Sequence, residues 1–173
     1  MGNVMIREAR PGELAAVGDL RVAAYAAGGF LSPGYAPELR ALGTQGDGTV
    51  LVADPGDAGP IAGTIMLVTW PTAGELISGP DEAEIRALAV APGGQHGGVG
   101  TGLLLTVLNW AELAGAKRVV LSTLPEMRAA HRLYERNGFV RLPDRDWSPR
   151  ADVRLLAYIL ELGTAEGDAR PGT

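Results

Sequence analysis

The chain has 173 residues, of which 46% are hydrophobic and 20% charged, a balance typical of a globular protein that buries one substantial core. Its formal net charge of −5 argues against a general nucleic-acid surface, so we expect no nucleic-acid partner. The sequence has no cysteine and only two histidines, which excludes thiolate ligands, argues against a histidine-based site and predicts no metal.

The first half of the chain mixes strands and helices. After an opening strand, Pro11 and Glu13 suit the start of a helix that runs to about Ala27 and ends at Gly28-Gly29. A shorter helix and two strands follow, and the turn-forming residues between those strands predict a hairpin. The predicted ranges are 4–9 for the first strand, 11–27 and 35–42 for the helices, and 49–53 and 61–70 for the hairpin strands.

A glycine-rich turn over 92–98 separates a predicted strand over 84–90 from a predicted helix over 98–114. The unpaired N–H groups of a helix start, together with its dipole, attract anions. Glycines at 97, 98, 100 and 102 would leave room for a phosphate there, with Gln95 and Thr101 as further donors. A plain turn before a core helix is the alternative interpretation.

Two common phosphate loops fit this turn poorly. A Walker loop ends in Gly-Lys-Ser/Thr, but no lysine occurs between Pro92 and Ala116. A Rossmann loop has the spacing Gly-x-Gly-x-x-Gly and an acidic residue about 20 positions later. Here the glycines run Gly98-x-Gly100-x-Gly102, and the next strand ends without an acid.

The second half continues with alternating elements. A strand over 118–123 precedes a helix over 125–137 that ends at Gly138, and strands over 139–142 and 153–162 should be antiparallel neighbours. The 84–90 and 118–123 strands, which the 98–114 helix connects, should be parallel. The polar Gly/Pro tail 164–173 is predicted to be disordered, which leaves residues 1–163 as one domain.

Two segments together resemble the GNAT superfamily of N-acetyltransferases. Leu88-Ala89-Val90-x-Pro92 followed by Gln95-x-x-Gly98-x-Gly100 is similar to its Gln/Arg-x-x-Gly-x-Gly/Ala segment, and 130–139 (AHRLYERNGF) to its Ala-x-x-Leu-Tyr-x-x-x-Gly-Phe signature. The departures are Gln95 where arginine is commoner, His96-Gly97 in place of Gly-Arg, and Met127 in place of a frequent asparagine. Fewer basic residues imply that backbone donors carry more of the phosphate binding.

The resemblance implies an α/β (α+β) fold. Its sheet would be mixed and mostly antiparallel, with six to seven strands, helices on both faces and a splayed parallel strand pair. It also implies acetyl-CoA as co-substrate. Backbone groups of Leu88, Ala89 and Val90 would then bind the pantetheine arm. The pyrophosphate would lie on the helix start, formed by Gln95, His96, Gly97, Gly98, Val99, Gly100, Thr101 and Gly102.

For the chemistry, the resemblance makes Tyr134 the candidate general acid, against the alternative that it only packs its helix on the sheet. Glu84 is the candidate base, drawing the amine proton through water, with Glu82 as a weaker substitute. Its alternative role is a solvated carboxylate at a strand end. Strict alternation would place Glu84, Arg86, Leu88 and Val90 on one face unless a bulge intervenes. His131 is interpreted as a surface histidine.

The resemblance also implies that the region around the first two helices overhangs the acceptor site. Tyr25, Phe30 and Tyr35, with Leu31 beside them, are candidate acceptor residues or else ordinary core anchors. The charged segment 143–150, with Trp147, either borders this site or forms a loop. The resulting prediction is direct acetyl transfer to a primary amine of a small-molecule or peptide acceptor. A binding module that holds acyl-CoA without turnover is the second hypothesis.

The sequence also bears on location and assembly. The N-terminus lacks the apolar core of a signal peptide, and no apolar run approaches the roughly 20 residues of a membrane span. We therefore expect a cytoplasmic protein without a membrane partner. Homodimers are frequent in the family that the chain resembles, and the residues leave monomer and homodimer open.

Overall fold

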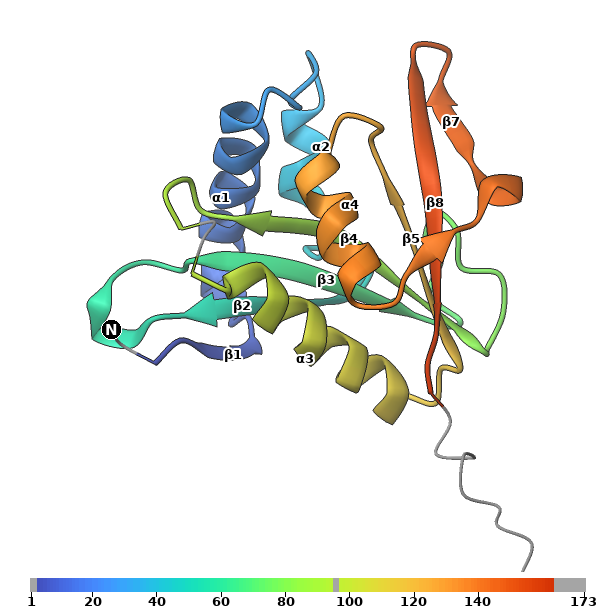
Figure 1. The fold of residues 1–173 in the computed structure, drawn as a ribbon. Coiled ribbons are helices and arrows are strands. Elements are labelled where there is room, and N and C mark those ends of the chain that lie inside the picture. Colours follow the sequence, from blue (N-terminus) through green and yellow to red (C-terminus); the bar gives the residue numbers. More distant parts are fainter. Residues whose placement is uncertain (1–2, 95–96, 164–173) are drawn as a thin grey trace, which may run out of the picture.

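The computed structural model describes residues 3–94 and 97–163, and its elements follow the predicted order (Figure 1). Gln95, His96 and the predicted tail 164–173 lie outside the described residues. The helices are α1 (Leu14–Ala27), α2 (Ala36–Ala41), α3 (Val99–Leu113) and α4 (Arg128–Arg136). The strands are β1 (Met5–Glu8), β2 (Thr49–Asp54), β3 (Gly63–Thr69), β4 (Glu82–Val90), β5 (Arg118–Thr123), β6 (Val140–Arg141), β7 (Trp147–Arg150) and β8 (Val153–Glu161). Short 3₁₀ turns occupy η1 (Pro11–Glu13), η2 (Gly56–Ala58) and η3 (Pro143–Arg145).

The strands form one sheet in the order β1-β2-β3-β4-β5-β8-β6, and β7 pairs with β8 beside this path. Only β4 and β5 run parallel, while the other pairs are antiparallel. The predicted mixed, mostly antiparallel fold is therefore confirmed. The sheet has eight strands, more than the six to seven predicted, because β7 lies in a segment whose exposed residues and Pro149 gave no strand signal.

Helices cover both faces of the sheet, as the fold class requires. In Figure 1, α3 and α4 lie on the near face, and α1 and α2 lie behind it. Alternation along β2 produces these two layers, because Leu51 and Ala53 belong to the α3–α4 core while Val50 and Val52 pack with Val17 of α1. Each fully buried aliphatic side chain contributes about 1.5–3 kcal/mol to folding.

A buried arginine joins α1 to α2. The Arg21 side chain is 1% exposed, and its Nη1 donates to the backbone oxygens of Leu39 at 2.9 Å and Leu42 at 2.7 Å. These carbonyls belong to the last turn of α2, where a positive charge is favoured. Burial lowers the pKa of Arg21 to about 10, so the guanidinium still keeps its charge at neutral pH. It thereby fixes the relative position of Tyr25 on α1 and Tyr35 just before α2.

Within residues 3–94 and 97–163, no helix combines the length and the apolar character needed to span a bilayer. In the same part of the chain, no three side chains of His, Asp or Glu gather closely enough to ligate a metal ion.

Candidate functional site

The two parallel strands separate partway along their length. β4 and β5 pair only from Glu82 with Arg118 to Ile85 with Leu121. Beyond that point β4 continues beside β3 as far as Val90, and β5 continues beside β8 as far as Thr123. The backbone of β4 after Ile85 therefore has no strand partner on the β5 side. We call this point, between Ile85 and Arg86 on β4 and between Leu121 and Ser122 on β5, the fork.

A β-bulge lies on β4 just after the fork. Ala87 has a positive φ of 53°, and the register passes from Arg86 opposite Met66 to Ala89 opposite Thr64, so two residues of β4 face one of β3. The bulge turns Leu88 toward the α3–α4 core. The expectation that Glu84, Arg86, Leu88 and Val90 share one face is thus wrong beyond Arg86. The cause is a bulge, the exception that the expectation allowed for.

The glycine turn leads into the start of α3. Gly98 caps the helix in the left-handed region with φ 76°, a conformation that favours glycine. The first backbone hydrogen bond of the helix runs from Gly102 N to Gly98 O at 2.9 Å. The preceding N–H groups of Val99, Gly100 and Thr101 therefore have no partner within the helix and form a cluster of donors.

Gly100 faces the passage between β4 and α4. A Cβ at this position would lie 3.6 Å from Val90 Cγ2 and 3.5 Å from Leu133 Cδ2, which are ordinary packing distances. The protein's own packing therefore does not demand glycine here. Its missing side chain leaves space beside the unpaired N–H groups, as an elongated anionic ligand requires. The contributions predicted for Gln95 and His96 fall outside the described residues.

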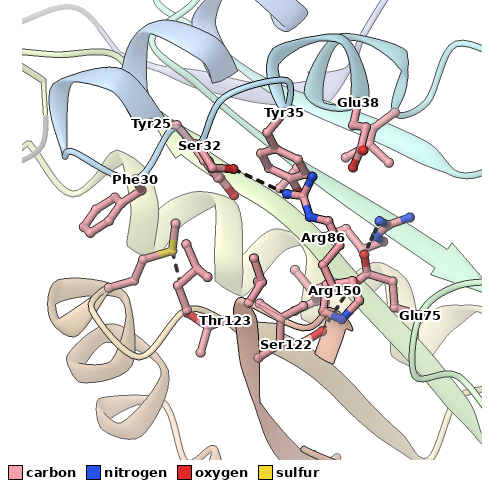
Figure 2. A pocket seen from close by; sticks show the side chains of 18 residues that line it. Tyr25, Phe30, Ser32, Tyr35, Glu38, Glu75, Arg86, Ser122, Thr123 and Arg150 are labelled. Carbon is pink, nitrogen blue, oxygen red and sulfur yellow. Dashed lines mark hydrogen bonds and ion pairs between the residues drawn. The ribbon is translucent and has the colours of Figure 1, made fainter. Parts of the chain in front are cut away.

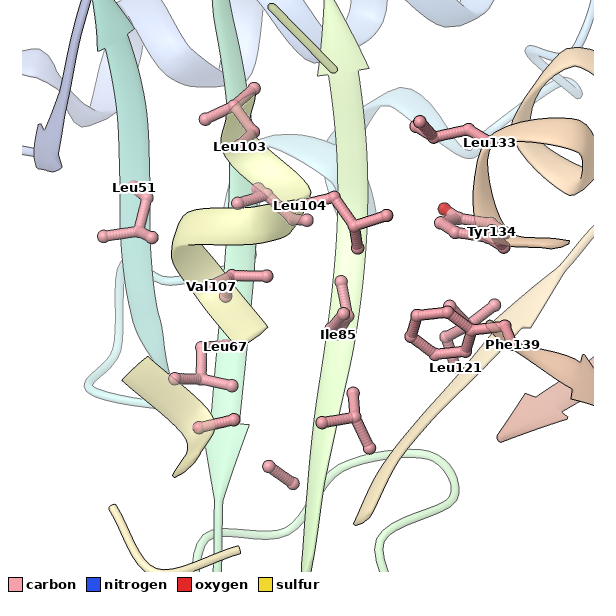
Figure 3. Close-up of a cluster of buried hydrophobic side chains, with 14 of the residues drawn as sticks. Leu51, Leu67, Ile85, Leu103, Leu104, Val107, Leu121, Leu133, Tyr134 and Phe139 are labelled. Atoms are coloured by element: carbon pink, nitrogen blue, oxygen red, sulfur yellow. The ribbon is translucent and has the colours of Figure 1, made fainter. Parts of the chain in front are cut away.

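Tyr134 lies on α4 with its ring in the core. The side chain is 6% exposed and packs against Phe139 and Tyr158, with centroid distances of 5.6 and 6.2 Å. Figure 3 shows the ring beside Phe139, with its oxygen pointing toward β4, the strand that carries Ile85. Burial raises the pKa of Tyr134, so the phenol keeps its proton at neutral pH.

A cavity of about 260 Å³ opens on the other side of the fork. The predicted residues Tyr25, Phe30 and Tyr35 all line it, together with Arg86 and Ala87 of β4 (Figure 2). Leu31 instead borders a neighbouring hollow that shares Phe30 and Ser32 with the cavity. Burial, then the phenols of Tyr35 and Tyr134, raise the pKa of Tyr25.

Charged and polar groups that the sequence argument did not select surround this cavity. Arg86 Nη2 donates to Glu75 Oε1 at 2.6 Å, and Ser122 Oγ donates to Glu75 Oε2 at 3.1 Å. Arg150 of β7 reaches Ser32 Oγ at 3.5 Å and lines the cavity with Pro149. The segment 143–150 therefore borders the cavity, one of the two alternatives for it.

Glu84, the predicted base, lies apart from the cavity lining. Its side chain is fully buried, and its carboxylate oxygens accept from the backbone N–H groups of Glu75, Leu76 and Ile77 at 2.8–3.3 Å. Burial raises the pKa of Glu84, and the hydrogen bonds from Leu76 and Ile77 oppose that rise. The alternative of a solvated carboxylate at a strand end is excluded, because no part of the side chain reaches solvent.

Two further candidates make structural contacts. Glu82 accepts from Arg145 Nη1 at 2.9 Å and from Ser78 N at 3.1 Å, so it too holds the β3–β4 loop. The imidazole of His131 is half-buried, with Nε2 2.9 Å from the Leu124 oxygen. His131 thus lies partly at the surface, with α4 placing its ring against the end of β5.

Known proteins resemble this chain in sequence pattern and in fold. The family model described as the acetyltransferase (GNAT) family matches residues 15–139. No curated protein matches the chain in sequence. Among solved structures, an acetyltransferase of the GNAT family from Staphylococcus aureus Mu50 is similar, with a TM-score of 0.73, 18% identity, and coverage of 93% of this chain and 100% of that chain.

Two other structures are similar over nearly the whole chain. A GNAT-family protein from Desulfovibrio desulfuricans has a TM-score of 0.71 and 22% identity, covering 92% of this chain and 99% of that chain. A GNAT-family acetyltransferase from Elizabethkingia anophelis with acetyl-CoA bound has a TM-score of 0.65 and 20% identity, covering 94% of this chain and 100% of that chain. At these identities the similarity establishes the fold.

Proposed function

The chain belongs to the GNAT acetyltransferase family, and from this premise we propose that it transfers the acetyl group of acetyl-CoA directly to a primary amine. The observation that carries the proposal is the fork between β4 and β5. It separates the α3 N-terminus and Tyr134 on one side of the sheet from the cavity on the other. A donor entering from α3 and an acceptor entering through the cavity would meet there.

The donor side suits a CoA ester in its charge and its shape. The N–H groups of Val99, Gly100 and Thr101 supply partial positive charge without a basic side chain, and Gly98 and Gly100 leave them accessible. The unpaired edge of β4 from Arg86 to Val90 offers backbone groups to an amide-containing arm. Leu88, Ala89 and Val90 are the residues that we propose for this contact.

Acetyl-CoA supplies a thioester whose carbonyl carbon is open to attack by a neutral amine. The backbone N–H groups beside the bulge would stabilise negative charge on the carbonyl oxygen. Tyr134 Oη would donate its proton to the sulfur as the carbon–nitrogen bond forms and the carbon–sulfur bond breaks, and the nitrogen would release one proton to water, which restores the Tyr134 phenol. Burial raises the pKa of Tyr134, so the phenol carries a proton at neutral pH.

The proposed base needs a different account from the proposed acid. Glu84 is buried and bound to three loop amides, so an acceptor in the cavity could reach it only after the loop had moved. We therefore assign Glu84 no direct contact with the amine. Tyr25, Phe30 and Tyr35 remain the residues proposed to border the acceptor.

The first experiment is calorimetric titration of the purified protein with acetyl-CoA, CoA and ATP. We expect acetyl-CoA and CoA to bind and ATP to fail, because the β4 edge recognises the pantetheine arm and not a nucleotide alone. A thiol-release assay with kanamycin, spermidine, L-methionine and a peptide with a free N-terminus should then reveal turnover. Absence of acetyl-CoA binding would contradict the proposal, and binding without turnover of any amine would favour the acyl-CoA-binding module.

A further inference from the structure

One carboxylate bridges the two strands at the fork. Arg86 and Ser122 are the first residues after the last parallel pair, Ile85 with Leu121. Both donate to Glu75, Arg86 Nη2 to Oε1 at 2.6 Å and Ser122 Oγ to Oε2 at 3.1 Å. The Glu75 side chain is 26% exposed and lines the cavity (Figure 2).

The buried carboxylate of Glu84 holds the loop that carries Glu75. The backbone N–H of Glu75 donates to Glu84 Oε2 at 2.8 Å, and a Cβ on the preceding Gly74 would overlap that same oxygen. A buried carboxylate is costly unless hydrogen bonds compensate it. Since Glu84 receives that compensation only while the loop is closed over it, the loop and Glu75 are held in one position.

A second set of contacts fixes the far end of the same loop. Glu82 accepts from Ser78 N at 3.1 Å and is paired with Arg145 Nη1 at 2.9 Å, while Arg145 Nη2 also donates to the Leu76 oxygen. Two glutamates of β4 thus serve the loop rather than the cavity. The carboxylate that this arrangement presents to the cavity is Glu75.

We propose that Glu75 anchors the acceptor amine as it enters in its ammonium form, which then loses one proton to water before attack, and that Glu84 is a positioning residue that holds Glu75 in place. The inference rests on the proposed function, because the fork is the acceptor's destination only if the acetyl group enters between β4 and β5. A carboxylate has about four lone-pair sites, and the Arg86 and Ser122 bonds leave others open to a donor. An ammonium group has three N–H donors that match them.

Steady-state kinetics with every panel amine that is acetylated test the anchor. Glu75→Gln should raise the KM for the amine roughly tenfold or more, because a charge-assisted hydrogen bond is lost. The KM for acetyl-CoA should stay unchanged. Glu38→Gln is the matched control, since Glu38 also lines the cavity but from α2. An unaltered amine KM in Glu75→Gln, or an equal rise in Glu38→Gln, would overturn the assignment.

The positioning role has its own signature. Glu84→Gln should raise the amine KM as Glu75→Gln does, because the glutamine NH₂ opposes the loop N–H donors and frees the loop. The double variant should then be no worse than Glu75→Gln alone, since both changes remove one anchor. A Glu84→Gln variant that lowers kcat at unchanged KM, with additive effects in the double variant, would make Glu84 the base itself.

A readout without turnover uses Trp147, whose Nε1 donates to Ser122 Oγ at 3.3 Å and so adjoins the Glu75 network. Propylammonium chloride at constant ionic strength should change its fluorescence in the wild type but not in Glu75→Gln, and Trp147→Phe identifies the signal. Equal responses in both proteins, or none in the wild type, would refute the ammonium site. Failure of acetyl-CoA to bind, with this response intact, would instead refute the proposed function.

Discussion

Tyr134 joins a buried ring to a hydroxyl near the fork. The ring is held by Phe139 and Tyr158, so its position does not depend on a ligand. Among the described residues no group hydrogen-bonds to the Tyr134 hydroxyl. The surrounding protein does not fully enclose its oxygen either. Packing alone would be satisfied by phenylalanine, so the hydroxyl is the part that requires a functional explanation.

Tyr134→Phe should therefore lower kcat roughly 10²-fold or more, the usual size of a general-acid contribution. Acetyl-CoA affinity from calorimetry and the melting temperature should change little, because the ring stays and no hydrogen bond to a described residue is lost.

Tyr158→Phe is the matched control for this prediction. Tyr158 belongs to the same aromatic cluster, but its hydroxyl already donates to Glu135 at 3.1 Å. Its kcat should stay near the wild-type value. Equal turnover in Tyr134→Phe and the wild type would leave Tyr134 with a packing role only.

At this scale the sequence predicted aromatic residues better than charged ones. Tyr25 lies on α1, Phe30 in the loop that follows and Tyr35 just before α2. Because the three are close in the sequence, this short segment brings all of them to the cavity. Glu75 is held at the cavity by hydrogen bonds from Arg86 and Ser122, and Ser122 lies 47 positions from Glu75 in the sequence. No local pattern distinguishes such a glutamate from any polar loop residue, and none shows that Glu84 is covered by a loop.

Among the elements, the β4–turn–α3 unit carries the donor side. Its strand, glycine-rich turn and helix were predictable because each depends on local chemistry: an apolar run, clustered glycines and a periodic apolar face. The bulge at Ala87 was not, since its position depends on how β4 aligns with β3. β7 was also missed, because a short strand containing Pro149 needs β8 beside it to form.

Gly100→Ala separates folding from cofactor binding in this unit. The added Cβ meets Val90 and Leu133 at ordinary distances, and alanine is favoured over glycine within a helix by up to about 1 kcal/mol. The melting temperature should therefore hold or rise. Acetyl-CoA affinity should fall about tenfold, because the methyl group occupies space beside the unpaired N–H groups.

Leu105→Ala serves as the control, since Leu105 lies on the same helix with its side chain 52% exposed. Its affinity for acetyl-CoA, measured by calorimetry, should match the wild type. Wild-type affinity in Gly100→Ala would show that the ligand does not pass between β4 and α4.

Across the whole molecule, arginine–carboxylate pairs hold both outer strands of the sheet. On β1, Arg7 donates to Glu13 at 2.7 and 2.9 Å and to Asp54 of β2 at 3.0 Å. On β6, Arg141 donates to Asp146 at 2.7 Å. Asp146 also accepts from the Ala157 N–H of β8 at 2.8 Å. Ionised carboxylates thus hold both outer strands, and a further pair, Glu82 with Arg145, lies on the central strand β4.

These pairs predict how stability changes with pH. Hydrogen bonds from Arg7 lower the pKa of Glu13 to about 2, and those from Arg141 lower the pKa of Asp146 well below its usual range. A carboxyl group whose folded pKa lies below its unfolded value stabilises the protein above the unfolded value, and this contribution is lost as pH falls toward the folded one. The melting temperature should therefore be steady from pH 7 to about 5 and fall increasingly below about 4.

Asp146→Asn tests this dependence directly. It should lower the melting temperature at pH 7 and flatten the decline between about pH 4 and 2, because the titrating partner of Arg141 has been removed. Asp57→Asn, which alters an exposed side chain in η2, should reproduce the wild-type profile. Amide hydrogen exchange near pH 3 should show β1 and β6 losing protection before β3 and β4, because the pairs of Arg7 and Arg141 hold the outer strands. Uniform loss of protection across the sheet, or an unchanged slope in Asp146→Asn, would mean that burial of the central strands alone sets the acid limit.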